Sequence, residues 1–368
     1  MKLLIAGGGT GGHIYPAISI ARAFQKQFSD AQVEFVGSPQ GLETQIIPRE
    51  NYKLHLISVG KLNYSGGVLK KIKTFIGLPL SIFQSVLLLV RIRPDIVLGV
   101  GGYVSGPLTL MSSLMGFKTY IWEPNAIPGV TNRWLSYFVE TSMVVYAEAE
   151  KYLKGSKILR VGMPVREVIE KLNNVSASEP KTQFNVLIFG GSQGARAINQ
   201  VVKDLLISDS LWRENIQFRH QTGKLDFQSI QEAYSHLHST DEKVSKVECF
   251  EYLHDMENQY LWADLIICRS GASTVAELAA CGKVALFIPL PWAADDHQKK
   301  NAESLVREGA ATMMEQKDLN PDSLKLKLLE LKNNSEIRKK MSEKIRSFHT
   351  TNAALKIAQI LGDKSEES

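Results

Sequence analysis

The sequence contains few cysteines and none of the common metal-binding motifs. Cys249, Cys268 and Cys281 are odd in number and form no C-x-x-C pair. Such a set argues against a disulfide framework or a zinc site, and it favours a reducing compartment. The sequence also has no Asp-x-Asp pair, no H-E-x-x-H and no G-x-x-x-x-G-K-[ST] motif. We therefore expect a protein that uses no metal and no other cofactor.

Long hydrophobic runs are missing as well. The best candidate, TFIGLPLSIFQSVLLLV over 74–90, has 17 residues and includes Pro79 and Gln84. A membrane-spanning helix needs about 20 mostly apolar residues, so we expect a packed helix preceded by a partly exposed apolar loop, with peripheral membrane contact at most. The short apolar run at the N-terminus leads directly into glycines, which is typical of a first β-strand and not of a signal peptide.

Acidic residues are absent from residues 51–94. The first 160 residues carry a net charge of +8 and the remainder −3. This asymmetry predicts an anionic partner for the first half, either a lipid surface or nucleic acid, with a solvated basic face as the alternative. Because aromatic residues are not interleaved with the basic ones, we expect an anionic membrane and no nucleic acid. The basic residues of the stretch are Lys53, Lys61, Lys70, Lys71, Lys73, Arg91 and Arg93.

A weak internal repeat divides the chain. At 368 residues the chain is longer than one hydrophobic core usually serves, so we expect two domains. KLLIAGGGTGGH (2–13) and NVLIFGGSQGAR (185–196) each combine a short strand, a glycine-rich turn and the start of an amphipathic helix. Pro16 is expected in the opening turn of the first helix. The polar sequence within 162–184 is typical of a surface loop, so we expect the hinge there.

Strands alternate with helices in both halves. This alternation predicts right-handed βαβ units and an α/β fold with two Rossmann-like, doubly wound parallel sheets that face a cleft. The further predicted strands are 32–37, 95–100, 118–123 and 141–146 in the first half, and 247–251, 265–268, 284–288 and 311–314 in the second.

GGGTGGH (7–13) stands between strand and helix, where a doubly wound sheet binds ligands. Glycines allow close approach to a ligand, and the following helix N-terminus is partly positive. The string also fits the G-x-G-x-x-G of a dinucleotide-binding oxidoreductase, which needs an acidic residue at the end of the second strand. That strand ends in Gly37 and Ser38, with Glu34 in its middle. The dinucleotide interpretation is therefore weakened, and a purely structural turn stays open.

His13 closes this turn and is the candidate general base. A helix N-terminus favours the neutral imidazole, which is the form that accepts a proton. A structural histidine is the alternative.

GGSQGAR (190–196) repeats the arrangement in the second half. Its backbone N–H groups, the Ser192 hydroxyl and the helix dipole suit a diphosphate. The string also contains the G-x-S-x-G of α/β-hydrolases, for which Asp264 and His297 would complete a triad. Because the first turn has the same form without a serine, anion binding explains the repeat better.

Two further segments follow predicted strands of the second half. In CRSGASTVAELAACG (268–282), Thr274 and Glu277 have the spacing of a capping box. The alternative is that the Glu277 carboxylate accepts both hydroxyls of a ribose. In PLPWAADDHQKKNA (289–302), polar side chains either bind sugar hydroxyls or start a helix; they are Asp295, Asp296, His297 and Gln298.

Together these strings resemble a known family. In order and spacing they are similar to the bacterial glycosyltransferases that add N-acetylglucosamine to lipid-linked N-acetylmuramyl-pentapeptide, the last cytoplasmic step of peptidoglycan precursor synthesis. The resemblance covers residues 2 to about 310. It rests on GGGTGGHIYPA, GSPQGLE (37–43), GVGGYVSGP (99–107), EPNAIPGVTNRWL (123–135), VGMPVR (161–166), GGSQGAR and RSGASTVAEL.

The resemblance implies a GT-B fold, UDP-N-acetylglucosamine as donor and an inverting mechanism. It implies an undecaprenyl-diphosphate-linked acceptor and a peripheral position on the cytoplasmic face of the membrane. Another inverting GT-B transferase with a lipid acceptor is the alternative. By motif position the implied substrate-binding residues are Thr10, Gly11, Gly12, Asn125, Arg166, Ser192, Leu253, Ala272, Ser273, Thr274, Glu277 and Gln298.

The domain boundaries follow from the same resemblance. We expect an acceptor- and membrane-facing domain over 1–163, a donor domain over 164–345, and a C-terminal helix over 346–368 that returns to the first domain and ends in a frayed tail. One departure concerns Trp122, which stands where the family often has histidine. Glu123 and Asn125 keep their register.

Overall fold

The chain folds into two compact units. The computed structural model describes residues 1–9, 11–59, 68–174, 183–191, 194–208, 215–235, 246–291 and 296–363, with backbone alone for 68–77 and 173–174. The first unit comprises residues 1–166 and 350–368, and the second comprises residues 167–349. Each unit contains one parallel sheet.

The first unit is built on a seven-stranded sheet with the order β3-β2-β1-β4-β5-β6-β7. All its described pairings are parallel, and the central strands are continuous apolar runs, as strands buried on both faces require. The strands are β1 Lys2–Gly7, β2 Gln32–Gly37, β3 Lys53–Leu56, β4 Ile96–Gly101, β5 Lys118–Glu123, β6 Thr141–Val144 and β7 Lys157–Arg160.

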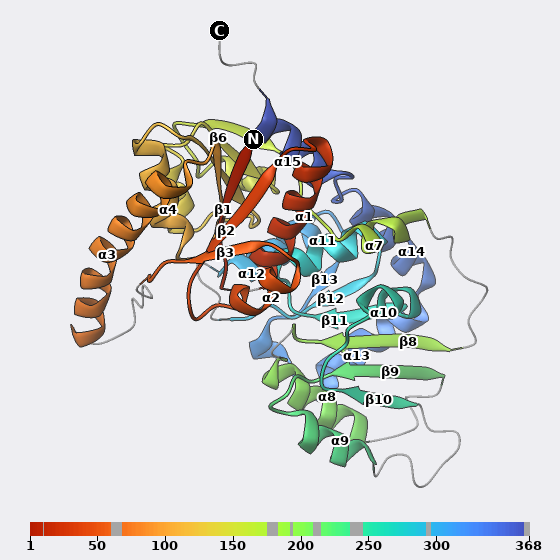
Figure 1. Cartoon of the computed structure of the whole chain (residues 1–368). Helices are drawn as coiled ribbons and strands as arrows, with labels where there is room; N and C mark the ends of the chain where they lie inside the picture. Colours follow the sequence, from red (N-terminus) through yellow and green to blue (C-terminus); the bar gives the residue numbers. More distant parts are fainter. Residues whose placement is uncertain are drawn as a thin grey trace. The chain divides into compact units, whose positions relative to one another are not determined.

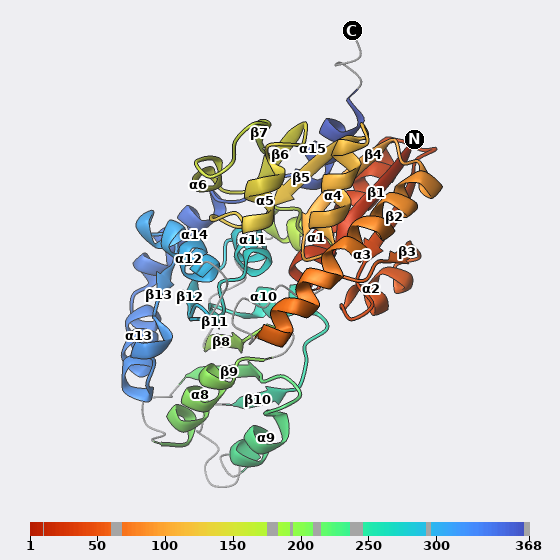
Figure 2. The ribbon, with the colours of Figure 1, turned by 90° about the vertical axis from the view of Figure 1, so that its left-hand side faces the viewer.

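Helices cover both faces of this sheet. Right-handed crossovers put α3 to α6 on one face, in the layer that faces the viewer in Figure 2, and α1 and α2 on the other. The C-terminal helix α15 packs against α1 (Figure 1). The helices are α1 Gly11–Gln27, α2 Glu43–Arg49, α3 Val68–Ile92, α4 Ser105–Leu114, α5 Val130–Leu135, α6 Ala147–Glu150 and α15 Ala353–Gly362.

The second unit is built on a six-stranded parallel sheet with the order β10-β9-β8-β11-β12-β13. Its strands are β8 Phe184–Phe189, β9 Ile216–Gln221, β10 Val247–Phe250, β11 Leu265–Cys268, β12 Ala285–Phe287 and β13 Thr312–Met313. Its helices are α7 Glu167–Glu170, α8 Arg196–Ser208, α9 Phe227–Ser235, α10 Met256–Trp262, α11 Ala272–Cys281, α12 His297–Arg307, α13 Pro321–Asn333 and α14 Ser335–Arg346.

The prediction of two doubly wound parallel sheets is confirmed. Every strand named from the sequence is present, within about two residues at its ends. Two details were wrong. Because Gly11 and Gly12 join α1, Pro16 lies inside that helix and not in its opening turn. The packed helix expected within 74–90 is present, but no loop directly precedes it, because α3 already begins at Val68 and continues through Pro79.

A buried histidine lies in the second unit at the end of β9. Asn199 Nδ2 donates to the Thr222 carbonyl and the Asp226 carboxylate, so Asn199 Oδ1 is left to face His220 Nε2 at 3.1 Å. His220 Nε2 therefore carries the proton, and Nδ1 accepts from the Tyr234 hydroxyl at 2.9 Å. Complete burial lowers the pKa of His220 to about 3.

This histidine predicts an acid sensitivity of folding. Unfolded His220 binds a proton near pH 6.5 and folded His220 does not, so stability is complete above pH 6.5 and falls as pH drops toward 3. The contribution reaches about 1.4 kcal/mol per pH unit. In denaturant unfolding at pH 7.5, 6.5 and 5.5, His220→Gln should flatten the pH dependence, and the exposed control His254→Gln should not. Equal slopes in both variants would contradict the assignment.

Candidate functional site

Each sheet has one switch point, where chain connections leave two neighbouring strands in opposite directions. In the first unit this point lies between β1 and β4, and in the second between β8 and β11. Ligands of doubly wound sheets bind outside the carboxyl ends of these strands. The sequence motifs that follow β1, β4, β8 and β11 therefore lie at the two positions where a ligand is expected to bind.

In the first unit, the glycine turn after β1 packs against the turn after β4. A methyl group on Gly102 would lie 2.6 Å from the Gly8 carbonyl oxygen, so no larger residue fits there without a shift. His13, in the first turn of α1, packs over Gly101, where an added methyl group would lie 2.8 Å from the imidazole Cε1 atom. Gly11 and Gly12 open the same helix, and Thr10 lies outside the described residues.

A buried carboxylate accepts a hydrogen bond from this turn. Glu43, only 1 % exposed, accepts hydrogen bonds from the Gly9 N–H at 2.7 Å, the Ser38 N–H at 2.8 Å and the Ser38 hydroxyl at 3.0 Å. A methyl group on Gly8 or Gly41 would collide with that carboxylate. The GSPQGLE motif thus supplies a carboxylate acceptor that fixes the backbone of the first glycine turn at Gly9.

A second buried carboxylate organises the loop after β5. Glu123 Oε1 accepts from the Asn125 N–H at 3.0 Å and from Asn125 Nδ2 at 3.1 Å. Its Oε2 accepts from the Gly129 N–H at 3.1 Å and Asn132 Nδ2 at 2.9 Å. Burial raises the pKa of Glu123, and the four N–H donors offset only part of that effect. Asn125 is therefore held in place by Glu123.

In the second unit, the glycine turn after β8 rests on the end of β9. Gln221 Nε2 donates to the Gly191 carbonyl at 3.0 Å. A methyl group on Gly194 would lie 1.9 Å from the Thr222 carbonyl oxygen, so that glycine is required by the close approach and by its φ of +76°. Ser192 lies outside the described residues. Arg166 is the last residue of the first unit before the chain enters the second unit.

The helix after β11 shows that the capping-box interpretation was wrong. Helix α11 begins at Ala272 with Gly271 as its N-cap, so Ala272, Ser273 and Thr274 form its first turn, and no side chain caps it. Glu277 lies about one and a half turns from the start, and its carboxylate accepts a hydrogen bond from the Tyr260 hydroxyl at 2.8 Å. Burial and the Glu277 carboxylate raise the pKa of Tyr260 well above its ordinary value, so this hydroxyl remains a donor.

The loop after β12 is tied to the loop after β11. Gln298 Oε1 accepts from the Leu290 N–H at 3.1 Å, and its backbone carbonyl accepts from the Ser270 hydroxyl at 2.8 Å. His297 begins α12, as one of the two interpretations expected. Leu253 follows β10, and its side chain is buried.

Two alternatives from the sequence are overturned. The acidic residue that follows β2 is Glu43, which binds the glycine turn itself and not a ribose, and Glu34 pairs with Lys53. The hydrolase triad fails because Asp264 accepts from the Asn185 N–H at the amino ends of β8 and β11. The G-x-S-x-G turn follows the opposite end of β8, about 20 Å along the strand.

Several residues that build the site were not identified from the sequence. Glu43 and Glu123 stood inside quoted motifs without a role, whereas Gln221 and Tyr260 belong to no motif. For Glu43 and Glu123 the sequence offered one signal, which is a carboxylate close to glycines and asparagines. The N–H groups of such residues need an acceptor, and a nearby carboxylate can supply it. Among the described ranges, no group of three or more His, Cys, Asp or Glu side chains is placed to hold a metal ion.

The Glu43 network predicts a stability effect. Glu43→Gln replaces a charged acceptor by an amide whose NH₂ group would face N–H donors, which costs about 1–3 kcal/mol. Thermal unfolding should show a melting temperature roughly 2–10 °C lower. Glu50→Gln, which breaks the exposed ion pair with Arg22 just beyond α2, should change it by little. If both variants melt alike, Glu43 does not support the turn.

Solved structures with similar folds agree with this architecture. A crystal structure of MurG from Acinetobacter baumannii aligns with a TM-score of 0.76 at 28% identity, and the alignment covers 98% of each chain. A UDP-N-acetylglucosamine 2-epimerase from Neisseria meningitidis aligns over 98% of this chain and 99% of that one, with a TM-score of 0.67 at 14% identity. The latter likeness concerns the fold alone.

Curated relatives and family models cover nearly the whole chain. A UDP-N-acetylglucosamine--N-acetylmuramyl-(pentapeptide) pyrophosphoryl-undecaprenol N-acetylglucosamine transferase from Bdellovibrio bacteriovorus is 46% identical over 97% of this chain and 98% of its own length. One of the same name from Myxococcus xanthus is 39% identical over 99% and 93%. The models of the glycosyltransferase family 28 N-terminal and C-terminal domains match residues 3–144 and 185–359. The chain belongs to glycosyltransferase family 28.

Proposed function

We propose that the chain transfers N-acetylglucosamine from UDP-N-acetylglucosamine to undecaprenyl-diphosphate-linked N-acetylmuramyl-pentapeptide, a step of peptidoglycan precursor synthesis. The observation that carries this proposal is the pair of glycine turns at the two switch points, each followed by a helix N-terminus. Such turns bind anionic groups of nucleotide ligands. The shared name of relatives that match along nearly the full chain supports these two substrates.

The proposed reaction is a single displacement with inversion. The C4 hydroxyl oxygen of the acceptor attacks the anomeric carbon, the bond from that carbon to the diphosphate oxygen breaks, and UDP leaves. His13 takes the hydroxyl proton, a role typically worth about 10²–10⁴ in rate. The N-termini of α8 and α11 stabilise the charge that develops on the diphosphate.

The substrate contacts are proposed on the same basis. In the first unit they are Thr10, Gly11, Gly12 and Asn125, of which Asn125 is held by Glu123. Glu277 is proposed to bind the donor ribose, Leu253 the uracil through its backbone and Gln298 the sugar. The remaining proposed contacts lie near the diphosphate or at the start of α11, and they are Arg166, Ser192, Ala272, Ser273 and Thr274.

The membrane contact is proposed for the outward side of α3. Leu80, Phe83, Leu87 and Val90 recur at three- and four-residue intervals and therefore form one row, with between 49 % and 62 % of each side chain exposed. Arg91 and Arg93 at the end of the helix are exposed, whereas Lys53 pairs with Glu34. The side chains of Lys70, Lys71 and Lys73 lie outside the described residues.

An exposed apolar row beside basic residues suits peripheral binding at the cytoplasmic face of the cell membrane. No described helix is both long enough and apolar enough to cross a bilayer.

The donor site is tested at Glu277. Glu277→Ala removes a charged acceptor and should lower kcat/KM for the donor about 10- to 100-fold, mainly through KM. Tyr260→Phe is the matched control, because it breaks the Tyr260–Glu277 hydrogen bond and keeps the carboxylate. That control should lower the melting temperature slightly and leave the donor KM nearly unchanged. Equal loss of donor affinity in both variants would mean that Glu277 only braces Tyr260.

The membrane contact is tested on α3. Phe83→Gln with Leu87→Gln removes the two most exposed side chains of the row and should weaken vesicle binding by roughly tenfold or more. Turnover of a soluble short-chain acceptor should remain normal. The control pair Leu225→Gln with Leu326→Gln removes exposed leucines of the second unit and should bind vesicles like the unmodified protein. Unchanged binding of the α3 variant would refute this assignment.

A further inference from the structure

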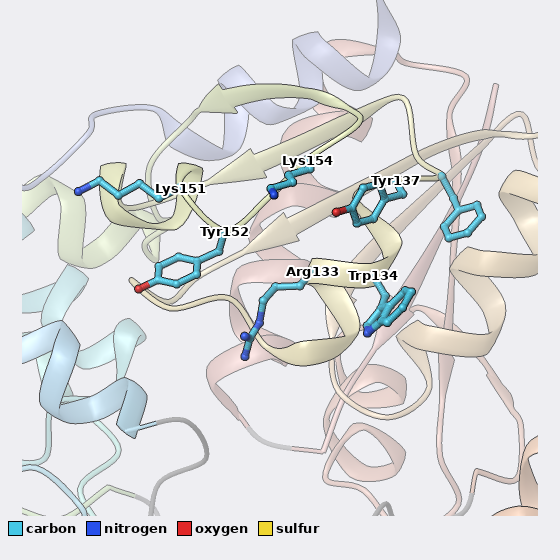
Figure 3. A pocket seen from close by; sticks show the side chains of 7 residues that line it. Arg133, Trp134, Tyr137, Lys151, Tyr152 and Lys154 are labelled. Atoms are coloured by element: carbon cyan, nitrogen blue, oxygen red, sulfur yellow. The ribbon is translucent and has the colours of Figure 1, made fainter.

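A pocket and a buried chain of hydrogen bonds lie outside the proposed substrate contacts. The pocket, of about 650 Å³, lies in the first unit between α5 and the segment after α6 (Figure 3). Helix α4 packs against both α3 and α5, so this pocket belongs to the helix layer of the proposed membrane contact. The hydrogen-bond chain lies in the second unit, where it leads from Tyr234 through His220 and Asn199 to Thr222.

The hydrogen bonds of this chain run in one direction, which the acceptors at its end determine. The Thr222 carbonyl and the Asp226 carboxylate both face the NH₂ group of Asn199, each at 2.8 Å. Asn199 Oδ1 then accepts from His220 Nε2 at 3.1 Å, and His220 Nδ1 accepts from the Tyr234 hydroxyl. The Nε2–H group of His220 therefore holds the Asn199 amide in the orientation that serves Thr222.

The chain ends at the carbonyl on which the second glycine turn rests. Gly194 lies two residues before α8, and a methyl group on it would come within 1.9 Å of the Thr222 carbonyl oxygen. The Gly194 N–H donates to the Gly191 carbonyl at 2.9 Å, and that carbonyl also accepts from Gln221. A shift of the Thr222 carbonyl would therefore displace the turn and the N-terminus of α8.

The members of the chain are buried, so water cannot replace a lost partner. Asn199 and Thr222 are each 1 % exposed, and His220 is fully enclosed. An unpaired polar group is costly in such surroundings, so a change at His220 is passed on to the Asn199 amide and from there to Thr222. The chain thus connects His220, at the end of β9, to the backbone of the glycine turn after β8.

We propose that His220 is a positioning residue for the nucleotide-sugar donor. Through Asn199 it holds the Thr222 carbonyl, and with it the glycine turn and the N-terminus of α8, where the diphosphate binds. Fixed dipoles stabilise a diphosphate only if they already point at it, so a small displacement of this N-terminus lowers the affinity for UDP. The inference rests on the proposed function and adds to it a residue that acts through others on the diphosphate site.

Two conservative variants test this role. His220→Gln can place its side-chain NH₂ group near the position of Nε2 and so retain the bond to Asn199, whereas the shorter side chain of His220→Asn cannot reach that far. His220→Asn should therefore raise the Kd of UDP about 3- to 10-fold, which corresponds to one lost hydrogen bond. His220→Gln should bind UDP nearly like the unmodified protein. Equal UDP affinity in the two variants would overturn the proposal.

A second measurement separates positioning from a general loss of structure. Uridine lacks the diphosphate, so its inhibition constant should stay nearly unchanged in His220→Asn, as should the KM of the acceptor. An equal loss of uridine and UDP binding would contradict the proposal. If His220→Asn does not fold, Asn199→Ser carries the same test, because its short side chain cannot span from α8 to the Thr222 carbonyl.

Tyr234→Phe is the control for stability. It removes the hydrogen bond from Tyr234 to His220 and should lower the melting temperature, but it leaves the bond between His220 and Asn199 in place. Its Kd for UDP should therefore stay close to that of the unmodified protein. A loss of UDP affinity that follows the melting temperature across all variants would mean that the chain only stabilises the fold. If the unmodified protein binds no UDP, the proposed function fails, whereas normal UDP binding in His220→Asn removes only the role of His220.

Discussion

Hydrogen bonds from buried side chains to glycine-rich turns are the interaction on which the site depends. A turn such as GGGTGGH has almost no side chains with which to hold itself, and glycine loses more conformational freedom on folding than any other residue. Glu43 supplies a charged acceptor for the Gly9 N–H in the first unit. Gln221 supplies a donor for the Gly191 carbonyl in the second. Gly9 and Gly191 are therefore held in place although neither has a side chain of its own.

This arrangement bears directly on the proposed chemistry. A diphosphate that leaves during the reaction gains charge, and fixed dipoles stabilise that charge better than groups that must reorient. The fixed turns lie at the positive ends of α1 and α8, and Glu123 likewise fixes the loop that carries Asn125. Each of the two sheets thus presents a prearranged surface at its switch point.

Much of the fold was predictable because apolar strands and glycine turns are local signals. β1, β5 and β8 are short apolar runs next to a turn or a polar residue, and all were predicted. β9, with the sequence IQFRHQ, was missed because its polar residues hide the strand pattern. His220 is nevertheless buried there, since Tyr234 and Asn199 satisfy both of its ring nitrogens. Such compensation comes from residues 14 and 21 positions away and has no local signature.

The site was predictable in part for the same reason. The glycine turns and the helix after β11 were identified from their own sequence. The capping box at Thr274 and Glu277 was a reasonable local interpretation, but α11 starts two residues before Thr274, and Tyr260 takes the carboxylate instead. The supporting residues come from neighbouring strands and loops, so their roles become visible only when the sheet order brings them together.

The central claim is that buried side chains fix the backbone of the glycine turns and of the loop after β5 before any ligand binds. Amide hydrogen exchange of the unliganded protein tests this claim most directly, because it reports on each backbone N–H that donates a hydrogen bond to a buried carboxylate. The amides of Gly9, Ser38, Asn125 and Gly129 should exchange at rates close to those of neighbouring strand amides. Exchange of these four amides as fast as that of exposed loop residues would contradict the account.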